Sequence, residues 1–274
     1  MSLLADKVAV VTGAGRGIGR AVALAYARMG ADVACVSRTE ENSAKVAAEV
    51  EALGRRAWPL AVDVSDTAAV DAAAKEILEL AGRVDILVNN AGVTRDNLLM
   101  RMSEEEWDLV TRVHLKGHFA PARHAIAHWR DRSKAGVEVA GRVVMTSSGA
   151  GLMGSIGQGN YAVAKAGIAL MVVQAAAEWG RYGVLVNGVA PDARTRMTEG
   201  VFYGDAPVES WDEKDPANVS PLMVWLGSSA CDVTGRVFEA TGGQLNVCDG
   251  WQHGSVISVG ERRFAVDEVG DAVH

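Results

Sequence analysis

The sequence predicts an α/β protein built on one doubly wound parallel sheet of seven strands, with helices on both faces. Short valine-rich runs alternate with helix-length stretches that carry alanine and leucine at helical spacing. The runs are almost continuously apolar, which is typical of parallel strands that are covered on both faces. With 274 residues, of which 49% are hydrophobic, the chain is long enough to bury a large core.

The first half of the chain repeats one strand, turn and helix unit. Strands are expected at residues 8–12, 32–37, 57–62 and 84–89, with helices at 17–29, 40–53 and 67–80 between them. Each helix-length stretch is followed by a glycine that can take the left-handed conformation in which helices end. These glycines are Gly30, Gly54 and Gly82.

The second half continues the alternation with longer helices. Ser103 and Glu106 are spaced as a capping box, so a helix is expected from 103 to 132, and Pro121 should kink or split it. Further strands are expected at 142–147, 184–190 and 236–240, and further helices at 160–182 and 216–226. No linker composition interrupts the pattern. We therefore expect one domain over residues 1–250, followed by a tail over 251–274.

Composition and charge narrow the functional class. A net charge of −7 argues against a nucleic-acid or anionic-membrane surface, because phosphate groups select basic patches. Cys35, Cys231 and Cys248 are too few and too far apart for a disulfide framework or a metal site. With no signal-peptide pattern and no charge-free span of membrane length, a cytoplasmic protein without a metal or a membrane partner is expected. The 30 glycines are more than a chain of this length usually has, so some of them should have a structural or binding role.

A glycine-rich turn lies between the first expected strand and the first expected helix. Thr12-Gly13-Ala14-Gly15-Arg16-Gly17-Ile18-Gly19 lets the backbone turn tightly and approach a pyrophosphate at the helix N-terminus. A turn of this kind between a strand and a helix indicates a Rossmann-like, dinucleotide-binding sheet. The spacing of Gly13, Gly17 and Gly19 departs from the usual Gly-x-Gly-x-x-Gly pattern.

Two later segments, taken together with this turn, give the chain its resemblance to a known family. Asn89-Asn90-Ala91-Gly92 ends the fourth expected strand, and Tyr161-Ala162-Val163-Ala164-Lys165 follows Ser148 by thirteen residues. Over residues from about 5 to about 245 the chain resembles the short-chain dehydrogenase/reductase family. The resemblance implies an NAD(P)-dependent oxidoreductase that interconverts a carbonyl group and a secondary alcohol.

Elementary chemistry assigns compatible roles to these residues. Tyr161 and Lys165 are i and i+4 on a helix, so the ammonium group can lower the pKa of the phenol and help it exchange a proton. Ser148 can hydrogen-bond a carbonyl oxygen as it becomes an alkoxide, and Ser147 is the neighbouring alternative. The resemblance implies that Lys165 also binds the nicotinamide ribose.

His114 stands where members of the family usually have an asparagine that holds a proton-relaying water. A neutral imidazole both donates and accepts hydrogen bonds, so His114 could replace it. The alternative is a histidine that only fills the helix kink. The expected catalytic residues are therefore Ser148, Tyr161, Lys165 and His114.

Cofactor choice depends on the end of the second strand. Ser37 and Arg38 occupy the place where an acidic residue would bind the ribose of NAD, and Arg16 lies in the glycine turn. Two guanidinium groups favour a phosphate, so NADP(H) is preferred and NAD(H) is possible. In the alternative, Arg38 points to solvent or pairs with Glu40 or Glu41, and the enzyme tolerates NAD.

Further cofactor contacts are implied by the resemblance. Asp63 and Val64 would contact the adenine, and Pro191 would lie at the nicotinamide beside Asp192, which stands where the family usually has glycine. The expected cofactor-binding residues are Thr12, Gly13, Gly15, Arg16, Gly17, Ile18, Gly19, Ser37, Arg38, Asp63, Val64, Asn90, Ala91, Gly92, Tyr161, Lys165 and Pro191.

The substrate class also follows from resemblance. His114, Thr146-Ser147-Ser148 and residues 190–198 resemble the (3R)-hydroxyacyl-CoA dehydrogenase part of peroxisomal multifunctional enzymes type 2. The first hundred residues are more similar to 3-oxoacyl-carrier-protein reductases. Both imply 3-oxoacyl and (3R)-hydroxyacyl thioesters as substrates, and a homodimer or homotetramer formed through helices 103–132 and 160–182.

Two alternatives remain open. The alternative substrate is a steroid or another hydrophobic alcohol. Phe202, Tyr203 and Trp211 follow the last nicotinamide-binding segment and could form a lid that suits a hydrophobic acyl or steroid-like group, or only a plain surface loop. A catalytically silent nucleotide-binding scaffold is the non-enzyme alternative. The presence of Ser148, Tyr161 and Lys165 together argues against it.

Overall fold

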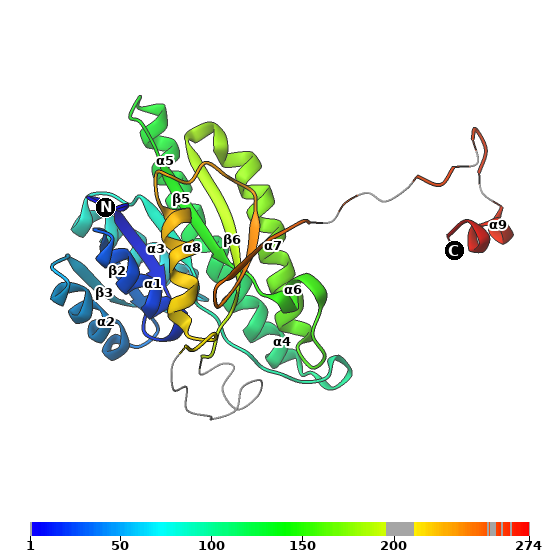
Figure 1. Ribbon diagram of the computed structural model, residues 1–274, viewed down its shortest axis with the longest axis horizontal. Coiled ribbons are helices and arrows are strands. Elements are labelled where there is room, and N and C mark those ends of the chain that lie inside the picture. The colour runs from blue at the N-terminus through cyan, green and yellow to red at the C-terminus, as the bar shows by residue number, and fades with distance from the viewer. Residues whose placement is uncertain are drawn as a thin grey trace.

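The computed structural model describes residues 2–195, 211–250, 252, 256–258, 260–263 and 265–273. It shows one central sheet with helices packed on both faces (Figure 1). The strands are β1 (Val8–Thr12), β2 (Asp32–Ser37), β3 (Ala57–Ala61), β4 (Ile86–Asn89), β5 (Gly141–Thr146), β6 (Val184–Asp192), β7 (Val237–Thr241) and β8 (Gln244–Cys248). The α-helices are α1 (Gly17–Arg28), α2 (Glu40–Ala52), α3 (Thr67–Ala81), α4 (Glu104–Thr111), α5 (Gly117–Lys134), α6 (Gly149–Met153), α7 (Gly159–Trp179), α8 (Ser220–Gly227) and α9 (Val266–Val273).

The strand order of the sheet is β3-β2-β1-β4-β5-β6-β7-β8. Neighbouring strands from β3 through to β7 are parallel, as predicted. The direction of winding reverses between β1 and β4, because β2 and β3 lie on one side of β1 while β4 to β7 lie on the other. Ligands of doubly wound sheets bind at the carboxyl ends of the strands beside such a reversal.

The sheet has an eighth strand that the sequence did not predict. β8 pairs antiparallel with β7, and the two are joined by Gly242-Gly243. Leu245 and Val247 are 58% and 60% exposed, so β8 is an edge strand without the buried apolar run that marks the others. Two strands separated by a Gly-Gly pair are a hairpin pattern, which is the signal that could have revealed β8.

Two sets of helices cover the sheet. The core on one face is formed by α1, α2 and α8 against β1, β2, β4, β5, β6 and β7. The core on the other face is formed by α3, α5 and α7. The predicted left-handed glycines are present, since φ is +95° at Gly30, +81° at Gly54 and +76° at Gly82. Because helices cover both faces of the sheet, the carboxyl ends of the strands remain as its open edge.

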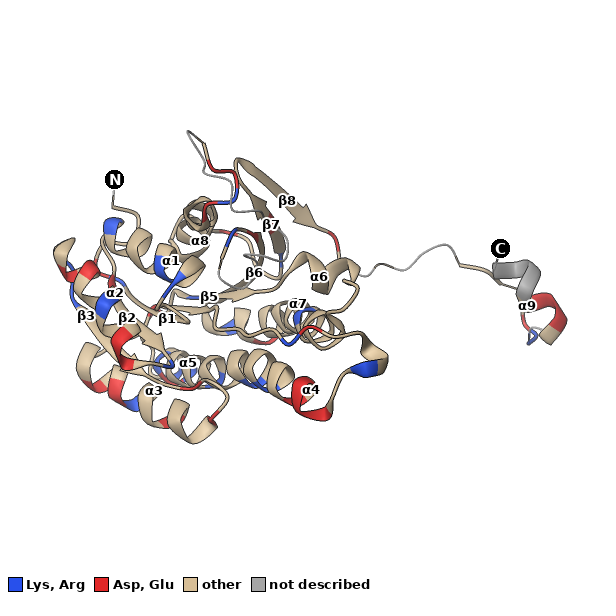
Figure 2. Cartoon of the chain, turned by 90° about the horizontal axis from the view of Figure 1, so that it is seen from below, with Lys and Arg blue, Asp and Glu red and all other residues tan. Residues whose placement is uncertain are grey.

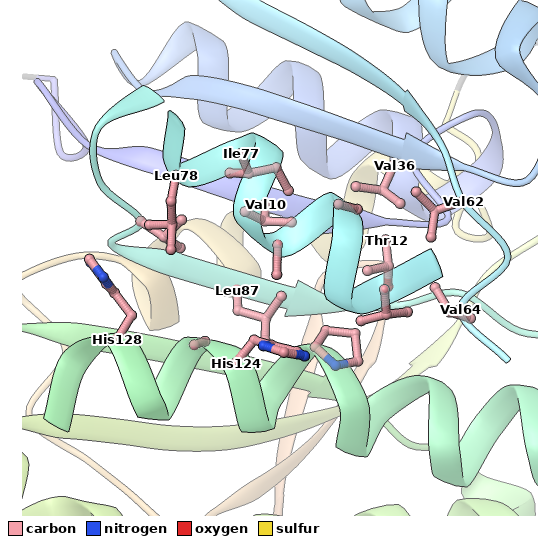
Figure 3. A pocket seen from close by; sticks show the side chains of 16 residues that line it. Val10, Thr12, Val36, Val62, Val64, Ile77, Leu78, Leu87, His124 and His128 are labelled. Carbon is pink, nitrogen blue, oxygen red and sulfur yellow. The ribbon is translucent and has the colours of Figure 1, made fainter. Parts of the chain in front are cut away.

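A small apolar cavity lies within the second core, between α3, α5 and the sheet (Figure 3). Its volume is about 60 Å³, and valines and leucines of β1, β2, β4 and α3 line it together with His124 and His128. None of the expected catalytic residues is among its lining residues. It is a packing cavity between the helices and the sheet, and Thr12 and Val64, which are expected cofactor-binding residues, line its end at the carboxyl edge of the strands.

The long helix expected at 103–132 is interrupted earlier than predicted. The capping box of Ser103 and Glu106 is present at the start of α4. A π-helical turn, η2 (Arg112–Lys116), then separates α4 from α5, while Pro121 lies inside α5. The break therefore lies at η2, where the chain changes its hydrogen-bond register, and α5 continues through Pro121.

The stretch Gly159–Tyr182 is long and apolar enough to cross a membrane by length and composition alone. It comprises α7 and the short helix η3 (Gly180–Tyr182). In the structure α7 packs on β5 and β6 and forms part of the second core, as Figure 1 shows. It is therefore a covering helix of the sheet. Beyond β8, α9 lies apart from the sheet and its helices in both views (Figures 1 and 2).

Candidate active site

The carboxyl ends of β1 and β4 are held together by Thr12. Its hydroxyl accepts hydrogen bonds from the amides of Asn90 (2.9 Å) and Ala91 (3.2 Å), and the Asn90 amide side chain donates to the Thr12 carbonyl (3.2 Å). Thr12 is only 2% exposed. Thr12, one of the expected cofactor-binding residues, thus holds the loop after β1 and the loop after β4 together at the reversal of the sheet.

The glycine turn is packed too closely for side chains. A Cβ at Gly19 would lie 2.1 Å from the Gly13 carbonyl oxygen, and one at Gly13 would lie 2.9 Å from the Ala91 Cα. Gly13 and Gly17 have φ of +68° and +54°, which favour glycine. The turn over residues 13–19, called the glycine cradle below, keeps side chains away from the backbone at its glycines and so fits the pyrophosphate of a dinucleotide. Ile18 lies in the first turn of α1. Thr195, from the segment 190–198 that carries part of the resemblance, lies near Gly17, where an added Cβ would be 3.4 Å from the Thr195 Cγ2.

The end of β2 meets the glycine turn. A Cβ at Gly15 would lie 2.7 Å from the Asn42 Cβ and 3.3 Å from the Ser37 Cβ, so Asn42 belongs to this corner although the sequence did not suggest it. Arg16 and Arg38 are both exposed. In the described part of the chain neither forms an ion pair, and Arg38 is not paired with Glu40 or Glu41.

The remaining expected cofactor contacts lie along the same edge. Asp63 is exposed and accepts hydrogen bonds from the amide and hydroxyl of Ser65, whereas Val64 is buried against Gly117. Pro191 lies near the end of β6, opposite Ala240 of β7. The following residue, Asp192, accepts hydrogen bonds from Lys214 (2.6 Å) and Thr241 (3.0 Å). The expected lid residues Phe202 and Tyr203 lie outside the described residues, and Trp211 is 64% exposed.

Ser148, Tyr161 and Lys165 come together beside this edge. Ser148 is the N-cap of α6, where its hydroxyl accepts a hydrogen bond from the Ala150 amide at 3.2 Å, and its side chain is near enough to Tyr161 to lower the pKa of the phenol. The Lys165 Nζ lies 5.5 Å from the centre of the Tyr161 ring and donates to the Thr146 carbonyl at 2.5 Å. The i, i+4 spacing on α7 therefore does bring both side chains to one face of the helix.

Ser147 and Ser148 are turned to different neighbours. The Ser147 hydroxyl is 1% exposed and donates to the Lys165 carbonyl at 2.9 Å, which fixes β5 against α7. Of the pair, Ser148 is the residue whose side chain acts on the pKa of the Tyr161 phenol. The geometry favours Ser148 as the group that binds a reacting oxygen.

Burial dominates the electrostatics of the pair on α7. It lowers the pKa of Lys165 to about 7. It also raises the pKa of Tyr161 above its usual value, which the hydrogen bond with Ser148 only partly offsets. The expected lowering of the phenol pKa is not met, because desolvation of the phenolate outweighs its neighbours. Tyr161 is therefore held as a protonated phenol.

His114 lies in the π-turn η2 with its ring edge-on to Tyr161, at a centroid distance of 5.2 Å and an interplanar angle of 85°. Its Nε2 lies 2.8 Å from the Val93 carbonyl oxygen and 3.2 Å from the Val93 amide. Burial, together with the charge of Lys165, lowers its pKa to about 3, so the ring is neutral. A Cβ at Gly92 would lie 2.6 Å from the His114 ring, so this glycine makes room for the histidine.

Three polar residues around Tyr161 were missed by the sequence argument. Asn160 is fully buried, donates to the carbonyls of Arg95 and Glu106, and accepts from the Tyr161 amide at 2.7 Å. Gln158 donates to Asp96, whose charge acts on Tyr161. Asn160 directly precedes Tyr161, and an asparagine at the start of a helix is the signal that could have identified it.

Comparison with known proteins places the chain in a family. A model described as short chain dehydrogenase matches residues 7–203. The chain therefore belongs to the short-chain dehydrogenase family and is an oxidoreductase with a nicotinamide cofactor, either NAD or NADP.

Particular relatives narrow the comparison. The chain is 44% identical to the hydroxyacyl-CoA dehydrogenase ChsB1 of Mycobacterium tuberculosis, over 96% of this chain and 84% of that one. It is 36% identical to a 3-oxoacyl-[acyl-carrier-protein] reductase of Vibrio harveyi, over 89% and 99%. It is also 36% identical to the mouse peroxisomal multifunctional enzyme type 2 over 87% of this chain, but spans only 32% of that enzyme.

A solved structure shares the whole architecture. A short chain dehydrogenase from Mycobacterium avium superposes with a TM-score of 0.91 at 48% identity, covering 99% of this chain and 94% of that one. Both the predicted family and the predicted Rossmann-like fold are thus confirmed.

Proposed function

We propose that the protein interconverts 3-oxoacyl and (3R)-hydroxyacyl thioesters with NADP(H). The observation that carries the proposal is the convergence of Ser148, Tyr161, Lys165 and His114 beside the glycine cradle. The relatives named for hydroxyacyl-CoA and 3-oxoacyl substrates support the thioester class.

The residues divide the chemistry between them. A nicotinamide cofactor whose pyrophosphate lies in the glycine cradle would supply or accept the hydride. Ser148 hydrogen-bonds the reacting oxygen, and Tyr161, held protonated by burial, gives its proton to that oxygen during reduction. Lys165 returns a proton to Tyr161, and a Lys165 pKa of about 7 lets it both hold and release one near neutral pH. His114 holds the relay position beside Tyr161.

The preference for NADP(H) rests on two unpaired guanidinium groups. Arg16 and Arg38 flank the corner formed by Gly15, Ser37 and Asn42, and no carboxylate pairs with either in the described residues. An adenosine 2′-phosphate placed there would gain charge-assisted hydrogen bonds that a 2′-hydroxyl would not. An acidic residue suited to NAD is not present at this corner.

A substrate and cofactor panel tests the proposal. We expect acetoacetyl-CoA and longer 3-oxoacyl-CoA esters to give the highest kcat/KM, with NADPH preferred over NADH and the preference lost in Arg38→Ser. Higher kcat/KM for steroid ketones or simple hydrophobic ketones would support the alternative substrate class. Binding of NADPH without turnover of any carbonyl compound would support a scaffold instead.

We further propose a cytoplasmic homodimer or homotetramer. Val163, Leu170 and Val173 of α7 are 52%, 67% and 49% exposed, and Phe119 of α5 is 52% exposed. An apolar helix face of this kind suits a symmetric contact between copies of the chain.

A further inference from the structure

The end of β6 carries a carboxylate that has no role in the proposed chemistry. Asp192 follows Pro191 and stands where the family usually has glycine. Its Oδ2 accepts a hydrogen bond from the Lys214 Nζ at 2.6 Å and another from the Thr241 hydroxyl of β7 at 3.0 Å. The Lys214 side chain is 21% exposed and the Asp192 side chain is 46% exposed. The ion pair is therefore half-buried, and it joins two stretches of chain that are 22 residues apart.

A second ion pair joins the same two stretches, residues 192–195 and 212–214. Arg194 lies 3.3 Å from the Asp212 carboxylate, and its backbone amide donates to the Lys214 carbonyl at 2.6 Å. The Asp212 carboxylate also accepts a hydrogen bond from the Lys214 amide at 2.9 Å. Side-chain ion pairs and a backbone hydrogen bond thus hold the residues that follow β6 against those that precede α8.

The second of these stretches is itself anchored to the rest of the fold. The Asn218 side chain donates to the carbonyls of Asp212 (2.8 Å) and Glu213 (3.1 Å). Gly242, in the turn between β7 and β8, lies against Glu213, because a Cβ there would be 2.6 Å from the Glu213 Cγ. Lys214 therefore reaches Asp192 from a backbone that is held at two points.

The first stretch, the 192–195 segment, runs from the sheet to the glycine cradle. Ala193 is 5% exposed and belongs to the core formed with α1 and α8. At the far end of the segment Thr195 lies near Gly17. The segment therefore connects the end of β6, where Pro191 is expected to bind the nicotinamide, with the turn that fits the pyrophosphate. Both points would contact one ligand, so the position of the segment decides how well they can do so together.

We propose that Asp192 and Lys214 are positioning residues for the dinucleotide, because their ion pair holds the 192–195 segment in place beside the glycine cradle and so raises the affinity for NADPH. A segment that is already held in its bound position loses less conformational freedom on binding, which lowers Kd. The inference rests on the proposed binding of the cofactor at the glycine cradle and Pro191. It does not depend on the identity of the substrate.

The first test is a double-mutant cycle on cofactor binding. Fluorescence titration gives the Kd for NADPH of the wild type, Asp192→Asn, Lys214→Met and the double variant. Asp192→Asn keeps an oxygen that can accept from Thr241, so it removes the charge alone. We expect each single variant to raise Kd about fivefold and the double variant to bind no more weakly than either, because all three lack the same ion pair. Lys214→Arg keeps the charge and should recover most of the affinity.

The signs of the two single effects separate positioning from a direct effect of charge on the cofactor. NADPH is an anion, so a direct effect would make it bind more tightly without the Asp192 carboxylate and more weakly without the Lys214 ammonium group. Opposite signs, an unchanged Kd in both variants, or additive losses in the double variant would overturn the proposal. Glu213→Gln is the matched control, because it removes a carboxylate 3.7 Å from the Lys214 Nζ and keeps the pair with Asp192. It should leave Kd within about twofold of the wild type.

Steady-state kinetics separate this role from a general loss of structure. We expect Lys214→Met to raise the KM for NADPH in the reduction of acetoacetyl-CoA, with a smaller effect on kcat and with Tm maintained. A loss confined to kcat, or a lower Tm without recovery in Lys214→Arg, would show a structural role and overturn the proposal. A wild type that prefers NADH, or that reduces no 3-oxoacyl thioester, would contradict the proposed function. The same Kd comparison, with NADH where it is preferred, would still decide the role of the ion pair.

Discussion

At the scale of single residues, the site shows which properties a sequence motif conveys and which it does not. The motif predicts that Tyr161 and Lys165 share a helix face, because their spacing alone determines this. It does not convey their burial, which raises the pKa of Tyr161 and lowers that of Lys165. Burial depends on β5, η2 and α7 closing around the pair, and no local pattern reports that.

The buried ammonium group of Lys165 makes a first prediction. Its pKa of about 7 in the folded protein lies below the ordinary lysine value of 10.5, so the unfolded state binds more protons between these values. Stability should therefore rise with pH across that window, and the cost of the buried charge should be fully present below it. Lys165→Met should abolish turnover yet raise the free energy of unfolding by a few kcal/mol near neutral pH.

Urea unfolding of Lys165→Met at several pH values provides the measurement. Lys75→Met, on the exposed surface of α3, is the control and should change neither the stability nor its pH dependence. A wild type whose stability is flat between about pH 7 and about pH 10 would contradict the assigned burial cost.

The glycine cradle makes a second prediction at this scale. Ala at position 19 would place a Cβ 2.1 Å from the Gly13 carbonyl oxygen, so the turn must deform. We expect Gly19→Ala to weaken NADPH binding by about tenfold or more in Kd, measured by fluorescence titration. Gly180→Ala adds the same methyl group where nothing lies within 4 Å and should bind NADPH like the wild type.

At the scale of elements, prediction from the sequence succeeded where one local signal determines the secondary structure. Strands β1, β2 and β4 to β7 were anticipated by their buried valine-rich runs, and α4 by its capping box. The edge strand β8 lacks a buried face, and no residue pattern distinguishes the π-turn η2 from the α-helices on either side of it. Both depend on tertiary neighbours, which explains why pattern reasoning missed them.

Asp32 joins two strands and makes a prediction about an element boundary. Its carboxylate, at the start of β2, accepts hydrogen bonds from the Arg56 amide and guanidinium and forms ion pairs with Arg55 and Arg56. Burial alone would raise the pKa of Asp32, but these partners hold it below its usual value. The stabilisation is therefore present above the pKa of the unfolded aspartate and is lost as pH falls through that of the folded one.

Asp32→Asn should lower the free energy of unfolding by about 1–3 kcal/mol at neutral pH, and by less in acid. Denaturant unfolding at both pH values measures this. Asp131→Asn removes a carboxylate from an exposed pair with Arg130 and should have little effect. A loss for Asp32→Asn that is as large in acid as at neutral pH would show that the carboxylate charge is not responsible.

At the scale of the whole molecule, the alternation of strands and helices predicted a parallel sheet covered on both faces, whereas the strand order, which places the site at the reversal between β1 and β4, came only from the structure. The contacts that complete the site were not predicted either. Asn160 from α7 and Asn42 from α2 reach the site only through packing of helices far apart in the sequence.

The exposed apolar face of α7 makes a prediction about assembly. We expect the wild type to be a dimer or tetramer by sedimentation, and Leu170→Glu to dissociate it, because a carboxylate would be buried in the contact. Leu80→Glu, on α3 and 51% exposed, should leave the assembly intact. A monomeric wild type would remove this expectation.

The central claim is that Tyr161 exchanges the proton during reduction of a 3-oxoacyl thioester, and one comparison tests it most directly. NADPH oxidation by Tyr161→Phe is measured with acetoacetyl-CoA beside the wild type, with NADPH affinity determined for both. The account predicts that kcat falls by about 10²-fold or more while the Kd for NADPH changes little. A Phe variant that retains the wild-type kcat would contradict it.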